Sequence, residues 1–269
     1  MAATSDVGAP AGPDRLDRAI AARGLAPSRE RAQMLIRAGL VRVDGQIAER
    51  PSQPVQASAV IEITGEALPY VGRGGLKLES ALKRFRLNVQ GALCLDVGAS
   101  TGGFTDCLLQ RGARKVVAIE VGHGQMHPRL RDDPRVELRE RANARHLQGQ
   151  QFEMPFDLAV IDVSFISLTL VLPAVAPLVR PGGHLVALVK PEFEAGRGAV
   201  DSRGVVRDPE ARRAATLKVI KHGRDELGLS VRGTEPALRM GANRETFVCF
   251  RVHPPAGDGE PSRPSEAPE

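Results

Sequence analysis

The segment 95–104 restricts the possible folds of this chain more than any other part of the sequence. It reads Leu-Asp-Val-Gly-Ala-Ser-Thr-Gly-Gly-Phe, an apolar run followed by a glycine-rich turn and the start of a helical pattern. Gly98, Gly102 and Gly103 have no Cβ, so a ligand can approach their backbone closely. The helix that follows directs unpaired N–H groups toward the same point. The segment therefore predicts a strand, turn and helix that bind a nucleoside-containing cofactor.

Strands and helices alternate along the chain from residue 93 onward. We expect strands at 93–97, 115–120, 135–138, 156–162, 184–189, 229–232 and 246–252, and helices at 105–111, 167–179 and 209–227. This alternation is typical of an α/β fold with a parallel sheet. The last two strands have no helix between them, which predicts an antiparallel hairpin at one edge. The expected domain therefore contains a seven-stranded, mostly parallel sheet.

Length and composition exclude several classes of protein. A chain of 269 residues suits two domains of unequal size. It has 42% hydrophobic residues, no apolar run that approaches a membrane helix, and a start unlike a secretory signal, so we expect a cytoplasmic protein with no membrane partner. Cys94, Cys107 and Cys249 form no CxxC motif or Cys/His cluster. We therefore expect buried thiols, with no metal site and no disulfide.

The charge of the chain is distributed unevenly. The net charge is +5, but the segment 254–269 contains four acids and one arginine, a net −3, so the remainder carries +8. A basic domain of this size favours a polyanionic partner. With no Trp, one Tyr and eight Phe, stacking on single-stranded bases is not expected to supply most of the affinity.

A small basic module precedes the α/β domain. Apolar positions at helical spacing predict one helix that begins at Leu16 and ends near Gly24, and a second helix that Ser28 caps. Asp44-Gly45, between alternating apolar residues, predicts a β-hairpin. The stretch 14–50 contains eight arginines against five acids, and so small a core cannot bury all of them. Some of these arginines must face solvent.

Several motifs in this module have the spacing of a known domain. They are Arg15-Leu16-Asp17, Arg23-Gly24-Leu25-Ala26-x-Ser28-Arg29, the pattern Leu-Ile-x-x-Gly-x-Val-x-Val-Asp-Gly at 35–45, and Pro51. Through them the module resembles the S4-like RNA-binding domains. That resemblance implies RNA contacts, since guanidinium groups fit phosphate well. The expected RNA-binding residues are Arg15, Arg18, Arg23, Arg29, Arg37 and Arg73. The alternative is a charged face that only contacts solvent.

The residues around the glycine turn discriminate between cofactors. A nicotinamide site would need glycine where Ser100 stands, and a P-loop would need a lysine and a hydroxyl residue in place of Phe104-Thr105. Asp96 would repel a phosphate, but it suits the amino group and sulfonium of S-adenosylmethionine. Glu120, at the end of the second strand, can bind both ribose hydroxyls, and Asn143 stands where an adenine edge would be read.

These considerations define a predicted set of cofactor-binding residues. The set is Asp96, Gly98, Ala99, Ser100, Thr101, Gly102, Gly103, Phe104, Glu120, Asn143 and Asp162. Two structural alternatives stay open, namely a tight turn that binds no ligand and, at Glu120, an acid that merely follows a strand.

Two further apolar strands are followed by charged residues. Asp162 follows the run 158–161, and Lys190 follows the run 185–189. Open α/β sheets place their active sites at this edge. A charge next to an apolar strand is costly to bury without a partner, and Lys77 and Glu245 are the candidate partners. The pattern is compatible both with catalysis and with a structural ion pair.

The order Lys77, Asp162, Lys190, Glu245 is accompanied by longer motifs. They are Gly98-Ala-Ser-Thr-Gly-Gly-Phe104, Asp162-x-Ser-Phe-Ile-Ser167, Val189-Lys-Pro-x-Phe-Glu194 and Gly204-Val-Val-x-Asp208. With these residues the chain resembles the FtsJ-like ribose 2′-O-methyltransferases. Together with the S4-like module it resembles the TlyA (haemolysin A) family of ribosomal RNA methyltransferases, from Arg15 to about Arg251. One departure is Tyr70, where the joint before Arg73 has no Trp.

The resemblance implies a fold and an activity. The fold is a Rossmann-like class I S-adenosylmethionine-dependent methyltransferase domain behind a small α+β S4-like domain. The activity is methylation of the ribose 2′-hydroxyl of cytidines in large-subunit ribosomal RNA, and for some members in small-subunit RNA. The implied parts are a disordered start at 1–13, the S4-like domain at 14–66, a linker at 67–75, the methyltransferase domain at 76–253 and a disordered tail at 254–269.

The implied chemistry gives each of the four charged residues a role. A ribose hydroxyl becomes a good nucleophile when a base takes its proton. Lys190 is the expected base, since a lysine loses its proton more readily when it is partly desolvated and near a second cation, here Lys77. Asp162 and Glu245 would orient the ammonium groups.

Other functions are weighed against this one. They are a noncatalytic ribosome-assembly factor, a membrane-acting cytolysin, and methylation of another RNA or of a base. The modified nucleotide, the choice of ribosomal subunit and the oligomeric state stay open.

Overall fold

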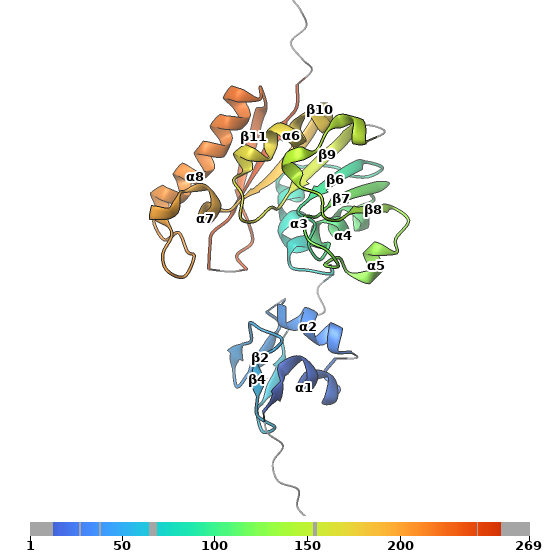
Figure 1. Ribbon diagram of the computed structural model, residues 1–269, viewed down its shortest axis with the longest axis vertical. Helices are drawn as coiled ribbons and strands as arrows, with labels where there is room; N and C mark the ends of the chain where they lie inside the picture. The colour runs from blue at the N-terminus through green and yellow to red at the C-terminus, as the bar shows by residue number, and fades with distance from the viewer. Residues whose placement is uncertain are drawn as a thin grey trace, which may run out of the picture. The chain divides into compact units, whose positions relative to one another are not determined.

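The computed structural model describes residues 13–26, 28–37, 39–64, 69–152, 155–240 and 242–253. It divides into two compact units, Met1–Arg73 and Gly74–Glu269, which are described separately (Figure 1).

The N-terminal unit combines two helices with short strands. Its elements are β1 (Asp14–Arg15), α1 (Leu16–Ala22), α2 (Arg29–Arg37), β2 (Val41–Val43), β3 (Gln46–Ile47), β4 (Pro54–Val55) and β5 (Ile61–Ile63). The sheet β3-β2-β5 is antiparallel, and β1 pairs with β4. The predicted cap is confirmed, since Ser28 Oγ accepts the backbone N–H of Arg31 at 3.1 Å. The predicted hairpin is also confirmed, with Asp44 and Gly45 both at positive φ between β2 and β3.

The C-terminal unit is an α/β domain around one large sheet. Its strands are β6 (Leu93–Val97), β7 (Lys115–Ile119), β8 (Val136–Arg139), β9 (Phe156–Ile161), β10 (Val179–Val189), β11 (Ser230–Pro236) and β12 (Thr246–Arg251). They lie in the order β11-β12-β10-β9-β6-β7-β8. The five strands from β6 to β10 are parallel, whereas β12 and β11 are antiparallel to their neighbours. The predicted α/β fold and its seven-stranded sheet with an antiparallel edge are confirmed.

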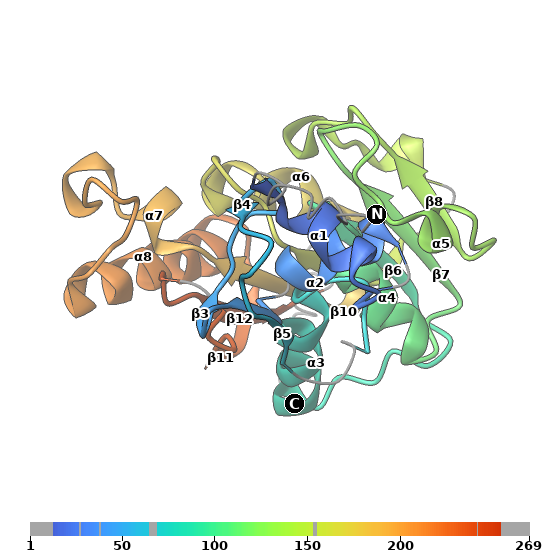
Figure 2. The ribbon, with the colours of Figure 1, turned by 90° about the horizontal axis from the view of Figure 1, so that it is seen from below.

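Helices and shorter turns connect these strands. The helices are α3 (Gly74–Phe85), α4 (Gly103–Gln110), α5 (Pro128–Arg131), α6 (Leu172–Val175), α7 (Pro191–Glu194) and α8 (Pro209–Lys221). The 3-10 turns are η1 (Ala144–His146), η2 (Gly149–Gln151), η3 (Leu168–Leu170), η4 (Ala176–Leu178) and η5 (Arg197–Ala199), and the π-helical turn is η6 (His222–Glu226). α7 lies beside α8 in both ribbon views (Figure 1, Figure 2).

Two predicted helices and two predicted strands differ from the structure. One of these strands, predicted at 229–232, extends over Ser230–Pro236. The pattern at 167–179 forms η3, α6 and η4 in succession, because Pro173 and Pro177 lack the N–H that a continuous helix needs. The predicted helix at 209–227 becomes α8 followed by η6. The strand predicted at 184–189 starts earlier, at Val179, with an irregularity in its pairing before His184.

The core of this unit holds the strand ends in place. Leu95 and Ile161, from the parallel strands, share one buried cluster with Leu172 of α6 and Val219 of α8. Each of these side chains is fully buried. Because β6, β9 and β10 run parallel in this packed sheet, the residues that follow them meet at a single edge.

Candidate active site

The glycine turn between β6 and α4 has an unusual backbone. Gly98 (φ +87°), Ser100 (φ +47°) and Gly102 (φ +93°) all lie in the left-handed region. A Cβ at Gly98 would collide with the carbonyl oxygen of Asp162, and one at Gly102 would collide with the side chain of Leu130. Besides leaving the backbone accessible, the glycines are therefore required by close packing within the protein. The sequence predicted a turn of this kind, either open to a ligand or merely tight, but not these packing contacts.

Asp96 has one satisfied and one unsatisfied carboxylate oxygen among the described residues. Its side chain is fully buried, and Oδ2 accepts the hydroxyl of Thr105 at 2.6 Å. Oδ1 is buried and has no hydrogen-bond partner within the described part of the chain. Burial, aided by the negative charges of Asp162 and Glu120 and opposed by Thr105, raises the pKa of Asp96 to about 7. A buried carboxylate oxygen of this kind calls for a proton, a donor or a cation.

Glu120 and Asn143 already have partners within the protein. Glu120 accepts the backbone N–H of Ser100 at 2.8 Å and that of Gly122 at 2.7 Å, which ties the glycine turn to the end of β7. Asn143 is exposed, and its Oδ1 accepts the backbone N–H of Arg145 at 3.0 Å to cap η1. Contacts of these two side chains with a cofactor stay predictions.

The four charged residues singled out by the sequence form two ion pairs. Lys190, which follows β10, places Nζ 2.6 Å from Oδ1 of Asp162, which follows β9. Lys77 of α3 pairs with Glu245, which directly precedes β12. Thr246 faces Val189 across the sheet, so the same register continued by one residue puts Glu245 opposite Lys190. The lysine side chains are only 15% (Lys77) and 13% (Lys190) exposed, so both charges sit in a partly desolvated site.

The loop after Asp162 contributes two residues that sequence reasoning gave no role. Lys190 Nζ donates to Ser164 Oγ at 2.8 Å. Phe165 has φ +64° and is 91% exposed, and its ring centroid lies 5.2 Å from that of Phe193 in α7. A bulky residue rarely adopts a left-handed conformation, and a phenyl ring gains nothing from facing water. The motif Asp-x-Ser-Phe marked both positions without assigning them a contact.

The predicted RNA-binding arginines have structural partners as well. Arg15 and Arg29 both pair with the buried Asp17, at 3.0 and 2.9 Å, and Gln33 donates to the same carboxylate at 2.7 Å. The hydrogen bonds from Arg15, followed by those from Arg29 and Gln33, hold the pKa of Asp17 well below its usual range. Both arginine side chains stay nearly half exposed. They stabilise the N-terminal unit whether or not they also bind RNA.

The remaining arginines of that prediction differ among themselves. Arg23 donates to the backbone carbonyls of Ala59 at 2.6 Å and Ala57 at 2.8 Å. Arg18 is exposed, and its guanidinium makes no ion pair within the described residues. Arg73 has contacts within the protein, and the side chain of Arg37 lies outside the described part.

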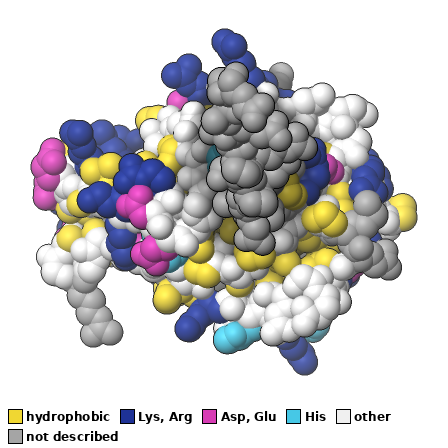
Figure 3. All heavy atoms as spheres, turned by 90° about the horizontal axis from the view of Figure 1, so that it is seen from above, with side chains coloured by type: hydrophobic (Ala, Val, Ile, Leu, Met, Phe, Trp, Pro, Cys, Tyr) yellow, Lys and Arg dark blue, Asp and Glu magenta, His cyan; other side chains and the backbone are white. Residues whose placement is uncertain are grey.

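Basic side chains elsewhere are dispersed. Figure 3 shows one face of the molecule, where Lys and Arg gather at several separate places near the rim, between hydrophobic, acidic and other side chains. On this face the charge does not form one continuous patch.

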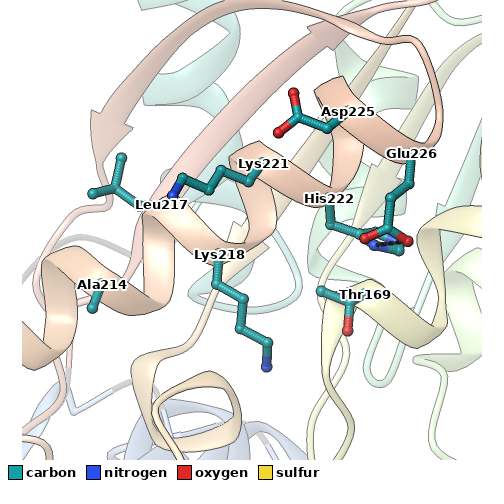
Figure 4. A pocket seen from close by; sticks show the side chains of 8 residues that line it. All are labelled: Thr169, Ala214, Leu217, Lys218, Lys221, His222, Asp225 and Glu226. Carbon is teal, nitrogen blue, oxygen red and sulfur yellow. Dashed lines mark ion pairs between the residues drawn. The ribbon is translucent and has the colours of Figure 1, made fainter.

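A surface hollow of about 600 Å³ lies between α8, η6 and η3 (Figure 4). It is lined by Thr169, Ala214, Leu217, Lys218, Lys221, His222, Asp225 and Glu226, none of which is a predicted site residue. Its charged groups are largely paired within the protein, His222 with Glu226 at 3.0 Å and Lys218 with Glu194 at 3.2 Å. It lacks the glycine backbone and the buried acid of the turn after β6.

None of the helices in the described part of the chain has the length and apolar composition needed to cross a membrane. No group of three or more His, Cys, Asp or Glu side chains among the described residues is arranged to hold a metal ion.

The sheet order, the glycine turn after β6 and the acids at the ends of β6, β7 and β9 define an α/β methyltransferase domain. Residues 70–252 match the FtsJ-like methyltransferase model, and residues 14–61 match the S4 domain. The chain belongs to the TlyA family of FtsJ-like methyltransferases, which confirms the resemblance seen in the sequence.

Relatives cover nearly the whole chain. The 16S/23S rRNA (cytidine-2′-O)-methyltransferase TlyA of Mycobacterium tuberculosis (strain H37Rv) is 45% identical over 88% of this chain and 90% of that protein. The putative rRNA methyltransferase YqxC of Bacillus subtilis (strain 168) is 40% identical over 95% of this chain and 90% of its own length. A solved structure of a putative hemolysin from Streptococcus thermophilus aligns with a TM-score of 0.70 and 39% identity, over 90% of this chain and 89% of that chain.

Proposed function

We propose that this protein transfers a methyl group from S-adenosylmethionine to the ribose 2′-hydroxyl of a cytidine in ribosomal RNA. Large-subunit RNA is the first candidate substrate, and small-subunit RNA is the second. The observation that carries the proposal is the pair of partly desolvated Lys–acid ion pairs at the sheet edge that also bears the glycine turn. The name of the Mycobacterium tuberculosis relative, which specifies this reaction, supports it.

The residues around the turn fit the proposed cofactor. The buried, unpartnered Oδ1 of Asp96 can accept a hydrogen bond from an amino group, and its negative charge suits a cation. The turn from Gly98 to Gly102 would receive the rest of the molecule along its backbone, and Glu120 retains lone pairs beyond its two backbone contacts. When bound, S-adenosylmethionine supplies an electrophilic methyl group.

Lys190 would act as the general base. In its neutral form Nζ would accept the proton of the 2′-hydroxyl, and the ribose oxygen would use the freed electron pair to form the new O–C bond. The bond between the methyl carbon and sulfur would break in the same step, and its electron pair would stay on the sulfur of the departing thioether. Asp162, 2.6 Å away, stabilises the ammonium that results. The second pair, Lys77 with Glu245, keeps another cation near Lys190 while limiting the total charge of the site.

The substrate nucleotide would approach over Phe165. Phe165 is almost fully exposed three residues after Asp162, and its ring contacts that of Phe193, which stands three residues after Lys190. A base stacked on this ring would bury apolar area that water otherwise covers, and such contacts tolerate different sequences. We propose that Phe165 contacts the nucleotide whose ribose is methylated.

The test is transfer of labelled methyl groups to isolated large and small subunits, followed by mapping of the modified ribose. We expect 2′-O-methylcytidine with the wild-type protein, and loss of transfer by at least about 100-fold with Lys190→Ala while cofactor binding is retained. A wild-type protein that labels neither subunit would contradict the proposed function. Near-normal transfer by Lys190→Ala would contradict the assignment of the base.

A further inference from the structure

We propose that Ser164 is a positioning residue that aims the amine of Lys190 at the ribose hydroxyl; this inference rests on the function proposed above. Ser164 stands two residues after Asp162, in the irregular segment between β9 and η3. Its Oγ lies 2.8 Å from Nζ of Lys190, and Asp162 Oδ1 lies 2.6 Å from the same atom. One loop thus offers two oxygen acceptors to one amine.

Two acceptors can fix the direction of the lone pair on a lysine base. A neutral amine has two N–H groups and one lone pair in a tetrahedral arrangement, and rotation about Cε–Nζ can direct the lone pair to any of three positions. An acceptor that holds only one N–H leaves two of these positions open. When Ser164 accepts one hydrogen and the Asp162 carboxylate of the ion pair attracts the other, the lone pair is confined to the remaining direction. Ser164 therefore supplies orientation, which strongly affects the rate of proton transfer.

The structure gives Ser164 no other task. Its hydroxyl makes no hydrogen bond to the backbone within the described residues, and the residue is exposed. Ser167, three residues later, shows what a structural serine does in this loop. Its Oγ accepts the N–H of Thr169 to cap η3, and it donates to Glu194 at 2.6 Å. The same residue type thus has a folding role at one position and a contact with the base at the other.

The backbone around Ser164 is fixed from both sides. The N–H of Asp162 bonds to the carbonyl of Val97 at 2.9 Å, and the carbonyl of Asp162 packs against Gly98 so closely that no side chain fits there. On the other side, Phe165 is held in a left-handed conformation. A hydroxyl presented from a segment constrained in this way can hold a long, flexible lysine in one orientation.

The inference is tested with Ser164→Ala, Ser164→Thr and the control Ser202→Ala, which removes an exposed hydroxyl with no hydrogen bond in the described structure. We expect Ser164→Ala to lower kcat about tenfold with unchanged KM for the subunit and unchanged cofactor affinity. Ser164→Thr keeps the hydroxyl and should recover kcat to within about threefold of wild type. Ser202→Ala should match wild type.

Two outcomes would overturn the role of Ser164. One is a wild-type kcat for Ser164→Ala while Lys190→Ala is inactive, which leaves the proposed function intact and removes Ser164 from it. The other is a loss for Ser164→Ala that Thr does not restore and that comes with a lower Tm and a raised KM, the signature of a merely structural residue. Failure of the wild-type protein to methylate either subunit is a separate result, because it overturns the proposed function first.

Discussion

Asp17 of the N-terminal unit and Asp96 of the C-terminal unit are both fully buried aspartates, yet their surroundings are opposite. Asp17 receives side-chain hydrogen bonds from Arg15, Arg29 and Gln33, and its pKa is lowered. Asp96 receives one from the hydroxyl of Thr105, keeps a buried oxygen without a partner, and has its pKa raised to about 7.

Asp17 has all its hydrogen-bond partners within the folded chain, whereas Asp96 does not. The charge of Asp17 is compensated by the chain itself, so its interactions contribute to folding. One carboxylate oxygen of Asp96 has no donor among the described residues, and for this reason we propose that a cofactor supplies one. Buried polar groups are nearly always satisfied, and an exception of this kind at a strand end is typical of a binding site.

The largest expected effect is a loss of stability on removal of Asp17. Asp17→Ala leaves two guanidinium groups and an amide without their common acceptor, and should lower the free energy of unfolding of the N-terminal unit by about 3 kcal/mol. This is the lower end of the usual range, because Arg15 and Arg29 are 42% and 46% exposed and water can partly replace the carboxylate.

The measurement is denaturant unfolding of the full chain, with hydrogen exchange to locate the loss to residues 14–64. Glu49→Ala, at an exposed acid with no ion pair within the described residues, is the control for removal of a negative charge. Equal stabilities of Asp17→Ala and Glu49→Ala would show that the arginine cluster contributes nothing to folding.

A smaller effect on the free energy of unfolding is expected at Asp96, and its pH dependence is opposite to that of Asp17. The unfolded chain releases the proton of this residue near pH 4, whereas the folded chain holds it to about pH 7. The folded state therefore binds more protons between these values, and the stabilisation that results is complete below about pH 4 and is lost as the pH rises through about 7. Asp17, whose pKa is lowered, instead contributes stability that is lost in acid.

The variant Asp96→Asn removes this pH-dependent contribution to stability, since the amide does not titrate. Without cofactor, its stability relative to wild type should rise by about 2 kcal/mol between pH 5 and pH 7. Unfolding midpoints of both proteins across this range give the difference directly. A difference that does not change with pH would mean that Asp96 is ionised throughout and has a partner that the structure does not show.

The comparison also explains what could be predicted from the sequence. The central strands β6, β7, β9 and β10 were predictable because each contains a run of apolar residues, and the glycine turn because few residues tolerate its backbone. Lys190 and Asp162 were found because charges stand directly after such runs. The role of Asp17 as a buried acceptor was not predicted, because its partner Arg29 is on another helix and nothing in the local pattern links the two residues. Ser164 was missed for a related reason, since the direction of a loop side chain depends on packing that only three dimensions show.

The smallest expected effect is on RNA binding, and it distinguishes an arginine that would contact phosphate from one that stabilises the N-terminal unit. Arg18 follows Asp17 directly, but its side chain is exposed and makes no ion pair within the described residues, whereas Arg29 is bonded to Asp17. If Arg18 contacts a phosphate, Arg18→Ala should weaken binding to the ribosomal subunit about threefold and lower the salt dependence of binding by about one counterion, with no change in stability. Arg29→Ala should lower stability.

The control is Arg213→Ala, at an exposed arginine of α8, which removes the same charge elsewhere and should leave the salt dependence almost unchanged. Equal binding by Arg18→Ala and Arg213→Ala would show that net charge, and not the position of Arg18, determines the affinity of this unit for RNA.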